Sequence, residues 1–382
     1  MSQPERSRLQ HRPLRPELVV VIVILATGSV ALWLSNIRLN RALREESARL
    51  EGLADLVEEA ERRSFSRADF DAARGELEQA LTETELRVRT LEAAADARER
   101  VIARASESII FVQGSYGFVE PESGRPLRHF YGRGGRPLRL PDGMTMVTTG
   151  GDGPIVQILY TGTAFVISGD GLMMTNHHVA EPWEFEENAQ FTLRAGFAAD
   201  RRRLVGFLPG LEEPIDLEIV ATGDGADLAV LRFVTPTALP PALEISDEVP
   251  HPGDEIVVMG YPAGVEALLA RADPNFAEGL LASGPVSFWD VGRALAVGGY
   301  IRPLSTQGII GQVTDAMVVY DAGTTRGGSG GPVLGLDGKV LAVNSAVLSR
   351  FAGSNLGVPA AAVRRLLASL ADGRANSSRR DR

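Results

Sequence analysis

The chain has 382 residues, of which 44% are hydrophobic and 23% are charged, and its formal net charge is −10. This length suits one large or two small domains with additional segments, and the negative charge argues against a general nucleic-acid-binding surface. The absence of cysteine excludes a thiol nucleophile, a disulfide framework and cysteine-ligated zinc. We expect no metal site and no cofactor.

The first 35 residues divide into a basic tail, 1–17, and an apolar run, 18–35, that we interpret as a transmembrane signal-anchor. A cleaved signal peptide is the alternative, because residues 29–31 form a weak small-x-small cleavage site. The apolar run continues past that point through residues 32–34, which favours an uncleaved anchor. Four arginines lie on each side of the run, so the charge count does not decide the orientation.

Residues 36–105 contain no proline and are rich in Ala, Glu, Leu and Arg, which predicts a helical stalk or coiled coil. Heptad-like stripes over 43–60 and 77–95 are separated by a break at 62–69, where Ser66 would cap a new helix. One continuous rod and a hairpin both fit this pattern. The stripes either pack on the following domain or join copies of the chain, as a coiled-coil dimer or a trimer.

Short β-type runs separated by Gly and Pro fill residues 106–372, which predicts a mainly β domain. Residues 114–152 are rich in Gly, Pro and Arg, and we interpret them as a long surface loop. The polar end of the chain, 373–382, is expected to be a disordered tail.

Two motifs in this domain offer an acid–base pair. The adjacent histidines His177 and His178 follow a strand-like run, 163–168, and a Gly-Asp-Gly turn. A histidine at the point where a strand gives way to a turn is well placed to face a cleft. Asp227 begins a second apolar run, 227–233, and a carboxylate that leads into a buried strand needs a partner such as an imidazole N–H.

A third motif, Gly-Gly-Ser-Gly-Gly-Pro at residues 327–332, surrounds Ser329 with glycine. Glycine lets the backbone turn tightly and leaves amide N–H groups bare. This arrangement suits a nucleophile with an exposed hydroxyl beside donors that hold an oxyanion. Because such a turn by itself is more often a connector, the interpretation depends on the two upstream motifs.

The segments 175–179, 227–231 and 327–332 resemble the three catalytic motifs of chymotrypsin-fold serine proteases of the HtrA/Deg type, in the same His, Asp, Ser order. Residues 340–346 resemble the family's strand after the serine, and the similarity covers roughly 155–372. The resemblance implies two six-stranded antiparallel barrels with the site at their junction. The anchor and the stalk would precede these barrels.

In the family the catalytic histidine directly precedes Val or Ala, so the resemblance assigns that role to His178 and makes His177 a bystander. Ser329 would attack a peptide carbonyl, His178 would transfer the proton, and Asp227 would orient the imidazole. The backbone N–H groups of Gly327 and Ser329 would form the oxyanion hole.

Some positions depart from the family pattern. Gly328 stands where the family usually has Asn, which leaves the shape of the specificity pocket open. No Asp lies six residues before Ser329, so we expect cleavage after a small or medium aliphatic residue rather than after Arg or Lys. The residues expected in the specificity pocket are Gly323, Thr324, Asn344 and Ser345.

The family usually has a short connection where residues 265–304 intervene here, with a helix expected over 265–272. Segments of this length are usually functional or disordered, and we interpret this one as a region for substrate selection or control of activation. Only 53 residues follow Ser329, so we expect no PDZ domain, unlike most of the family.

Together these features predict a membrane-anchored serine endopeptidase of the bacterial inner membrane, with a periplasmic catalytic domain, that acts on exposed or misfolded envelope proteins. The alternative is a catalytically silent scaffold or chaperone-like module that its stalk tethers. Hydrolysis of a non-peptide ester is a third hypothesis. The expected partners are protein or peptide substrates, the membrane and further copies of the chain, but not nucleic acid.

Overall fold

The computed structural model describes residues 67–132, 136–139, 145–235, 239–282, 284–347 and 354–380. The predicted basic tail, the predicted anchor and the first part of the predicted stalk lie outside these ranges. Within them, no helix combines the length and the apolar character that crossing a membrane requires. The chain divides into two compact units, Met1–Arg89 and Thr90–Arg382.

One long helix, α2 (Arg67–Ser106), forms the described part of the predicted stalk and begins next to the proposed cap at Ser66. Exposed ion pairs four residues apart, such as Arg74–Glu78 at 2.8 Å, add a few tenths of a kcal/mol to such a helix. The helical prediction is confirmed here, whereas association through the apolar stripe stays a prediction. The stripe side chains are exposed in the single chain, at Leu77, Leu81, Val88 and Leu91.

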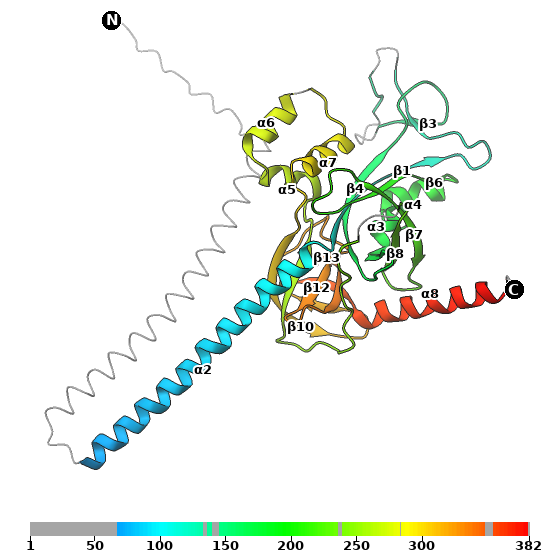
Figure 1. Ribbon diagram of the computed structural model, residues 1–382. Helices are drawn as coiled ribbons and strands as arrows, with labels where there is room; N and C mark the ends of the chain where they lie inside the picture. Colours follow the sequence, from blue (N-terminus) through cyan, green and yellow to red (C-terminus); the bar gives the residue numbers. More distant parts are fainter. Residues whose placement is uncertain are drawn as a thin grey trace, which may run out of the picture. The chain divides into compact units, whose positions relative to one another are not determined.

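The first barrel is closed by six antiparallel strands in the order β1-β4-β5-β8-β7-β6 (Figure 1). Alternate side chains of its first strand face two different cores, as strand geometry requires. Ile110 and Val112 pack inside this barrel, while Ile109 and Phe111 pack in a cluster that both barrels share. The strands are β1 (Ile109–Val119), β4 (Ile158–Val166), β5 (Leu172–Thr175), β6 (Ala198–Phe207), β7 (Ile215–Thr222) and β8 (Ala229–Phe233).

The second barrel is closed by six antiparallel strands in the order β10-β11-β14-β13-β12-β9. Its own core includes Val258, Tyr320 and Val333. The prediction of two six-stranded antiparallel barrels is therefore confirmed. The strands are β9 (Glu255–Gly260), β10 (Leu304–Val313), β11 (Val318–Tyr320), β12 (Pro332–Gly335), β13 (Val340–Val347) and β14 (Asn355–Pro359).

The shared cluster joins the two barrels and the end of α2. Val101 of α2 is buried in it together with Phe165 of the first barrel and Val257 of the second. Tyr261 lies fully buried in this layer and donates a hydrogen bond of 3.3 Å to the carbonyl of Ile109. Burial of this apolar surface fixes the two barrels against each other, and so fixes any site at their junction.

The prediction of a surface loop over 114–152 is wrong at its beginning, because β1 continues to Val119 as a buried strand. The glycines that suggested a loop serve close packing instead. A Cβ atom at Gly114 would collide with the ring of Tyr160, and one at Gly117 would lie 2.6 Å from the carbonyl oxygen of Val156. The rest of this stretch contains the small hairpin of β2 (Arg128–His129) and β3 (Val147–Thr148).

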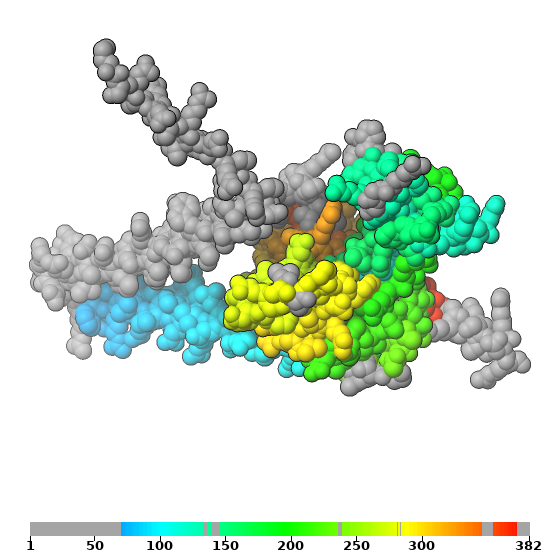
Figure 2. All heavy atoms as spheres, turned by 90° about the horizontal axis from the view of Figure 1, so that it is seen from above, coloured from blue at the N-terminus to red at the C-terminus, as the bar shows by residue number. Residues whose placement is uncertain are grey.

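Residues 265–304 form a helical insertion between β9 and β10. The expected helix is present as α5 (Gly264–Arg271), and α6 (Pro274–Ala282) and α7 (Phe288–Val297) follow it. The three helices lie together near β1 and β4 (Figure 1), where Gln113 of β1 donates a 3.2 Å hydrogen bond to the carbonyl of Phe288. Figure 2 shows these helices, in yellow, at the surface.

The end of the chain also differs from its prediction. Helix α8 (Ala360–Arg380) continues through residues 373–380, which we expected to be disordered. Its sequence is rich in Ala, Leu and Arg, and these strong helix formers outweigh the polar composition of its last turns.

Candidate active site

His178 and Asp227 come together because the strands next to them pair. Thr175 at the end of β5 is aligned with Ala229 at the start of β8, so the residues just outside this pair meet at one edge of the first barrel. There the short helix α3 (His177–Ala180) carries His178, and Asn176 donates a 2.8 Å hydrogen bond to the backbone carbonyl of Asp227.

The Asp227 carboxylate contacts His178 in two places. Its Oδ2 atom lies 2.8 Å from Nδ1 of the imidazole, and its Oδ1 atom accepts a 3.0 Å hydrogen bond from the His178 backbone N–H. Burial alone would raise the pKa of this carboxyl. The contacts with His178 and a hydrogen bond from Ser345 outweigh burial, and they hold the pKa of Asp227 below its ordinary value. The carboxylate is therefore ionised at neutral pH.

Ser345, which we predicted in the specificity pocket, has a contact with Asp227 that this prediction did not include. Its hydroxyl donates a 2.5 Å hydrogen bond to Oδ2 of Asp227, so the side chain belongs with the His178–Asp227 pair. Asn344 and Ser345 are neighbours on β13, and the pairing of this strand with β14 is irregular between Asn344 and Ala346.

Residues 327–331, the Ser329 turn, are held by backbone contacts from both barrels. Thr163 of the first barrel donates from its N–H to the carbonyl of Ser329 at 2.9 Å, and from its hydroxyl to the carbonyl of Gly327 at 2.7 Å. Gly327 and Gly330 have φ values of +89° and +86°, a region that glycine occupies without strain. A Cβ atom at Gly330 would also collide with the carbonyl oxygen of Thr163.

The Ser329 hydroxyl donates a 2.9 Å hydrogen bond to the backbone carbonyl of Ser345. Ser345 in turn binds Asp227, and Asp227 binds His178. The structure thus brings the three predicted side chains into one region. A direct hydrogen bond from Ser329 to His178 is not among the hydrogen bonds of the described residues.

The predicted oxyanion donors lie in the same turn. Within the described part of the chain, the N–H groups of Gly327 and Ser329 donate to no protein acceptor, whereas that of Gly330 donates to the carbonyl of Asn344 at 2.8 Å. Two free donors beside a serine hydroxyl are what stabilisation of a developing oxyanion requires.

The side chain of Asn344 is fully engaged with protein groups. It donates 2.7 Å to the carbonyl of Gly328 and 3.2 Å to the hydroxyl of Thr324, and it accepts 2.6 Å from the hydroxyl of Tyr320. It is 1% exposed, so it holds the turn through these hydrogen bonds and hardly faces solvent. A Cβ atom at Gly328 would collide with the Thr324 hydroxyl. Thr324 and Asn344 thus occupy the space beside Gly328 that a side chain at this position would need.

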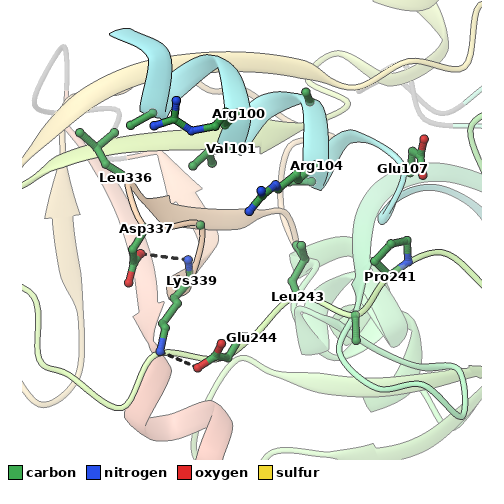
Figure 3. A pocket seen from close by; sticks show the side chains of 15 residues that line it. Arg100, Val101, Arg104, Glu107, Pro241, Leu243, Glu244, Leu336, Asp337 and Lys339 are labelled. Atoms are coloured by element: carbon green, nitrogen blue, oxygen red, sulfur yellow. Dashed lines mark hydrogen bonds and ion pairs between the residues drawn. The ribbon is translucent and has the colours of Figure 1, made fainter. Parts of the chain in front are cut away.

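Of the expected pocket residues, Gly323 and Thr324 line a cavity of about 10 Å³, together with Gly328 and Met259. A larger cavity of about 680 Å³ lies elsewhere, between the end of α2 and the segments 241–244 and 336–339 (Figure 3). Arg104 and Lys339 line it, and Lys339 contacts Glu244 at 2.5 Å. None of the predicted site residues lines this larger cavity.

Comparison with known proteins places this site in a family context. Residues 162–343 match the family described as trypsin-like peptidase domain. A probable periplasmic serine endoprotease DegP-like of Rhizobium meliloti is 27% identical over 267 residues, which cover 69% of this chain and 42% of the relative. The mitochondrial serine protease HTRA2 of Bos taurus is 28% identical over 207 residues, which cover 54% and 35%.

Solved structures with a similar arrangement include the serine endoprotease from Yersinia pestis, which is 17% identical with a TM-score of 0.41. The match covers 71% of this chain and 65% of that one. The active form of the Rv3671c protease from M. tuberculosis is 19% identical with a TM-score of 0.42, over 72% and 86% of the two chains.

The chain spans between 35% and 42% of the length of the curated relatives named above. The matched residues nevertheless include β5 to β12, parts of β4 and β13, the His178–Asp227 pair and the Ser329 turn. The chain therefore contains a trypsin-like peptidase domain whose curated homologues are serine proteases of the HtrA and DegP type.

Proposed function

We propose that this protein is a serine endopeptidase in which Ser329 is the nucleophile, His178 the general base and Asp227 the residue that orients the imidazole. One observation carries the proposal. The half-buried carboxylate of Asp227 lies 2.8 Å from Nδ1 of His178, in the same region where a glycine turn carries Ser329 and two free N–H donors. Nucleophile, base and orienting acid are the three parts of such a site.

The hydrogen bond between Nδ1 and Asp227 leaves Nε2 of His178 available to accept a proton. As Ser329 Oγ bonds to the substrate carbonyl carbon, its proton moves to Nε2 and the carbonyl oxygen becomes an oxyanion. The N–H groups of Gly327 and Ser329 stabilise that charge. The C–N bond then breaks, the amine leaves with the proton from Nε2, and an acyl-enzyme remains for hydrolysis by water.

The Ser329 hydroxyl must first leave its hydrogen bond with the Ser345 carbonyl. We propose that rotation about the Cα–Cβ bond turns the hydroxyl toward His178 and exchanges one hydrogen bond for another. Because one hydrogen bond replaces another, the net free-energy change is no more than the roughly 1 kcal/mol that a single hydrogen bond contributes. Binding of a substrate in the site would favour the reactive orientation.

We further propose that the substrates are exposed or misfolded envelope proteins and that residues 18–35 anchor the chain in the bacterial inner membrane. The name of the Rhizobium meliloti relative, a periplasmic endoprotease, supports an extracytoplasmic catalytic domain. Protease treatment of spheroplasts tests the location, since an extracytoplasmic domain is degraded and a cytoplasmic one is protected.

Labelling with a serine-directed fluorophosphonate, together with cleavage of unfolded casein, tests the enzyme. We expect the full chain to cleave casein and to carry the label on Ser329, and we expect Ser329→Ala to do neither. Heat-denatured protein is the control for nonspecific labelling. Equal behaviour of the two chains would instead support the alternative of a catalytically silent scaffold.

A further inference from the structure

We infer that His177, Glu181 and Glu184 form a binding site for a divalent transition-metal ion, for which Zn²⁺ is the best chemical match. The three residues lie on one short stretch that comprises α3 and the following turn η1 (Pro182–Glu184). Their nearest ligand atoms all lie within 4.8 Å of one another. This inference does not depend on the proposed peptidase activity.

The spacing of the ligand atoms fits a small cation. Nε2 of His177 lies 3.1 Å from Oε2 of Glu181 and 3.4 Å from Oε2 of Glu184. Zinc binds imidazole nitrogen and carboxylate oxygen at about 2.0–2.2 Å, and ligands at the corners of such a tetrahedron are about 3.3–3.6 Å apart. The three ligand atoms lie within 4.8 Å of one another, and any pair farther apart than these tetrahedral distances must move closer. Glu184 can make this movement, because its side chain is 47% exposed.

The geometry of the contacts also suits a metal ion. Two carboxylates converge on one imidazole, but only the Glu181 contact has hydrogen-bond geometry. A hydrogen bond at Nε2 therefore engages one carboxylate, whereas a metal ion would bind both carboxylates and the nitrogen. Arg201 balances one of the two negative charges, at 2.9 Å from Oε1 of Glu181.

The surroundings hold the ligands in place. Arg201 binds the oxygen of Glu181 that faces away from His177, as outer-shell partners of metal-bound carboxylates do. The guanidinium of Arg201 is itself held over the Trp183 ring, 5.2 Å from its centroid. Phe185 packs edge-on against the His177 ring at 5.1 Å. The Tyr160 hydroxyl, which is within electrostatic reach of Glu181, is buried with no hydrogen-bond partner among the described residues.

The pattern of the sequence alone does not predict this cluster, because His177 occupies the variable position of a motif that explains only His178. The cation would tie the segment that carries Phe185 to His177. The Phe185 ring also lies 6.0 Å from the His178 ring, edge to face, so the bound ion would restrain a residue next to the proposed general base.

Isothermal titration of Zn²⁺ into the Ser329→Ala chain, in buffer without chelators, tests the inference independently of proteolysis. We expect one Zn²⁺ per chain. Loss of an outer-shell partner typically weakens a metal site about 10- to 100-fold, so loss of a direct ligand in His177→Gln or Glu184→Gln should weaken it by at least about 100-fold. The matched control is His251→Gln, which removes a histidine that is 82% exposed and leaves the cluster intact.

Co²⁺ provides a second measurement, because four-coordinate Co²⁺ absorbs strongly in the visible region and six-coordinate Co²⁺ does so weakly. We expect the strong absorption in the parent chain and in His251→Gln, and its loss in Glu184→Gln. Urea unfolding midpoints confirm that each variant is folded. Absence of Zn²⁺ binding, or equal affinity in the parent and in both ligand variants, would overturn the inference.

Discussion

The two halves of the proposed active site differ in how far the structure prepares them. In the half that the first barrel supplies, His178 and Asp227 are locked together by two hydrogen bonds and supported by Ser345. In the half that the second barrel supplies, the backbone of the turn is fixed but the Ser329 hydroxyl is bound to a carbonyl. The proposed acid–base half is therefore held in place by side-chain hydrogen bonds, while the proposed nucleophile donates its hydroxyl to a backbone carbonyl instead of to the base.

The largest effect is expected from breaking the prepared half. Asp227→Asn keeps the size of the side chain but removes the charge that selects the tautomer of His178. We expect kcat to fall by about 10⁴-fold, as for the equivalent change in the well-studied triad. The kcat of casein or peptide hydrolysis is the measurement. A loss of less than tenfold would show that Asp227 does not orient the base.

Gly330→Ala tests whether the backbone of the second half is as rigid as the structure implies. The new Cβ atom collides with the Thr163 carbonyl at a φ of +86°. Overpacking and backbone strain of about 1–3 kcal/mol each predict a loss of roughly 2–6 kcal/mol in the free energy of unfolding, measured with urea.

A second glycine supplies the control for that experiment. Gly338 also has a positive φ, +84°, but its nearest neighbour, a Val101 methyl, lies 3.8 Å from the position of a Cβ atom. Gly338→Ala carries the strain without the collision, so it should cost about 1–3 kcal/mol. Equal losses in the two variants would mean that the contact with Thr163 does not restrain the turn.

Ser345→Ala affects both halves, since the hydroxyl of Ser345 supports Asp227 while its carbonyl, which remains, holds Ser329. A hydrogen bond to a charged group contributes about 1.5–3 kcal/mol. We therefore expect kcat/KM to fall roughly 10- to 150-fold with little change in KM. If Ser345→Thr keeps the kcat/KM of the parent chain, the hydroxyl group is responsible for the loss seen in Ser345→Ala. An unchanged kcat would remove Ser345 from the support of Asp227.

The smallest effect concerns the stability of the acid–base half at low pH. Because the folded-state pKa of Asp227 is lowered, its contribution to stability is present above the unfolded value of about 3.9 and is lost as the pH falls through the folded value. In the Ser329→Ala background, the difference in unfolding free energy between the parent and Asp227→Asn should shrink below about pH 4. Urea unfolding of both chains at a series of pH values from 7 to 3 measures this difference in free energy. A difference that stays constant with pH would contradict the lowered pKa of Asp227.

Much of the fold was accessible from sequence because the signals were local. Short β-type runs indicated a mainly β domain, and three short motifs indicated residues that the structure brings into one region. The two barrels were implied by the resemblance that these motifs carry. What the sequence left out depends on close approach in space. Gly114 and Gly117 suggested a loop because the sequence does not show that they pack against Tyr160 and Val156. The pairing of Ser345 with Asp227 joins residues 118 positions apart.

The contacts of Thr163 with the Ser329 turn have a consequence for how the protein is made. The first barrel emerges from the ribosome before the second, and domains fold in that order. The carbonyls of Gly327 and Ser329 receive their hydrogen bonds from Thr163 only when both barrels are complete and packed. We therefore expect a partly synthesised chain to hold the proposed base without an assembled nucleophile, and to stay inactive until the second barrel is complete.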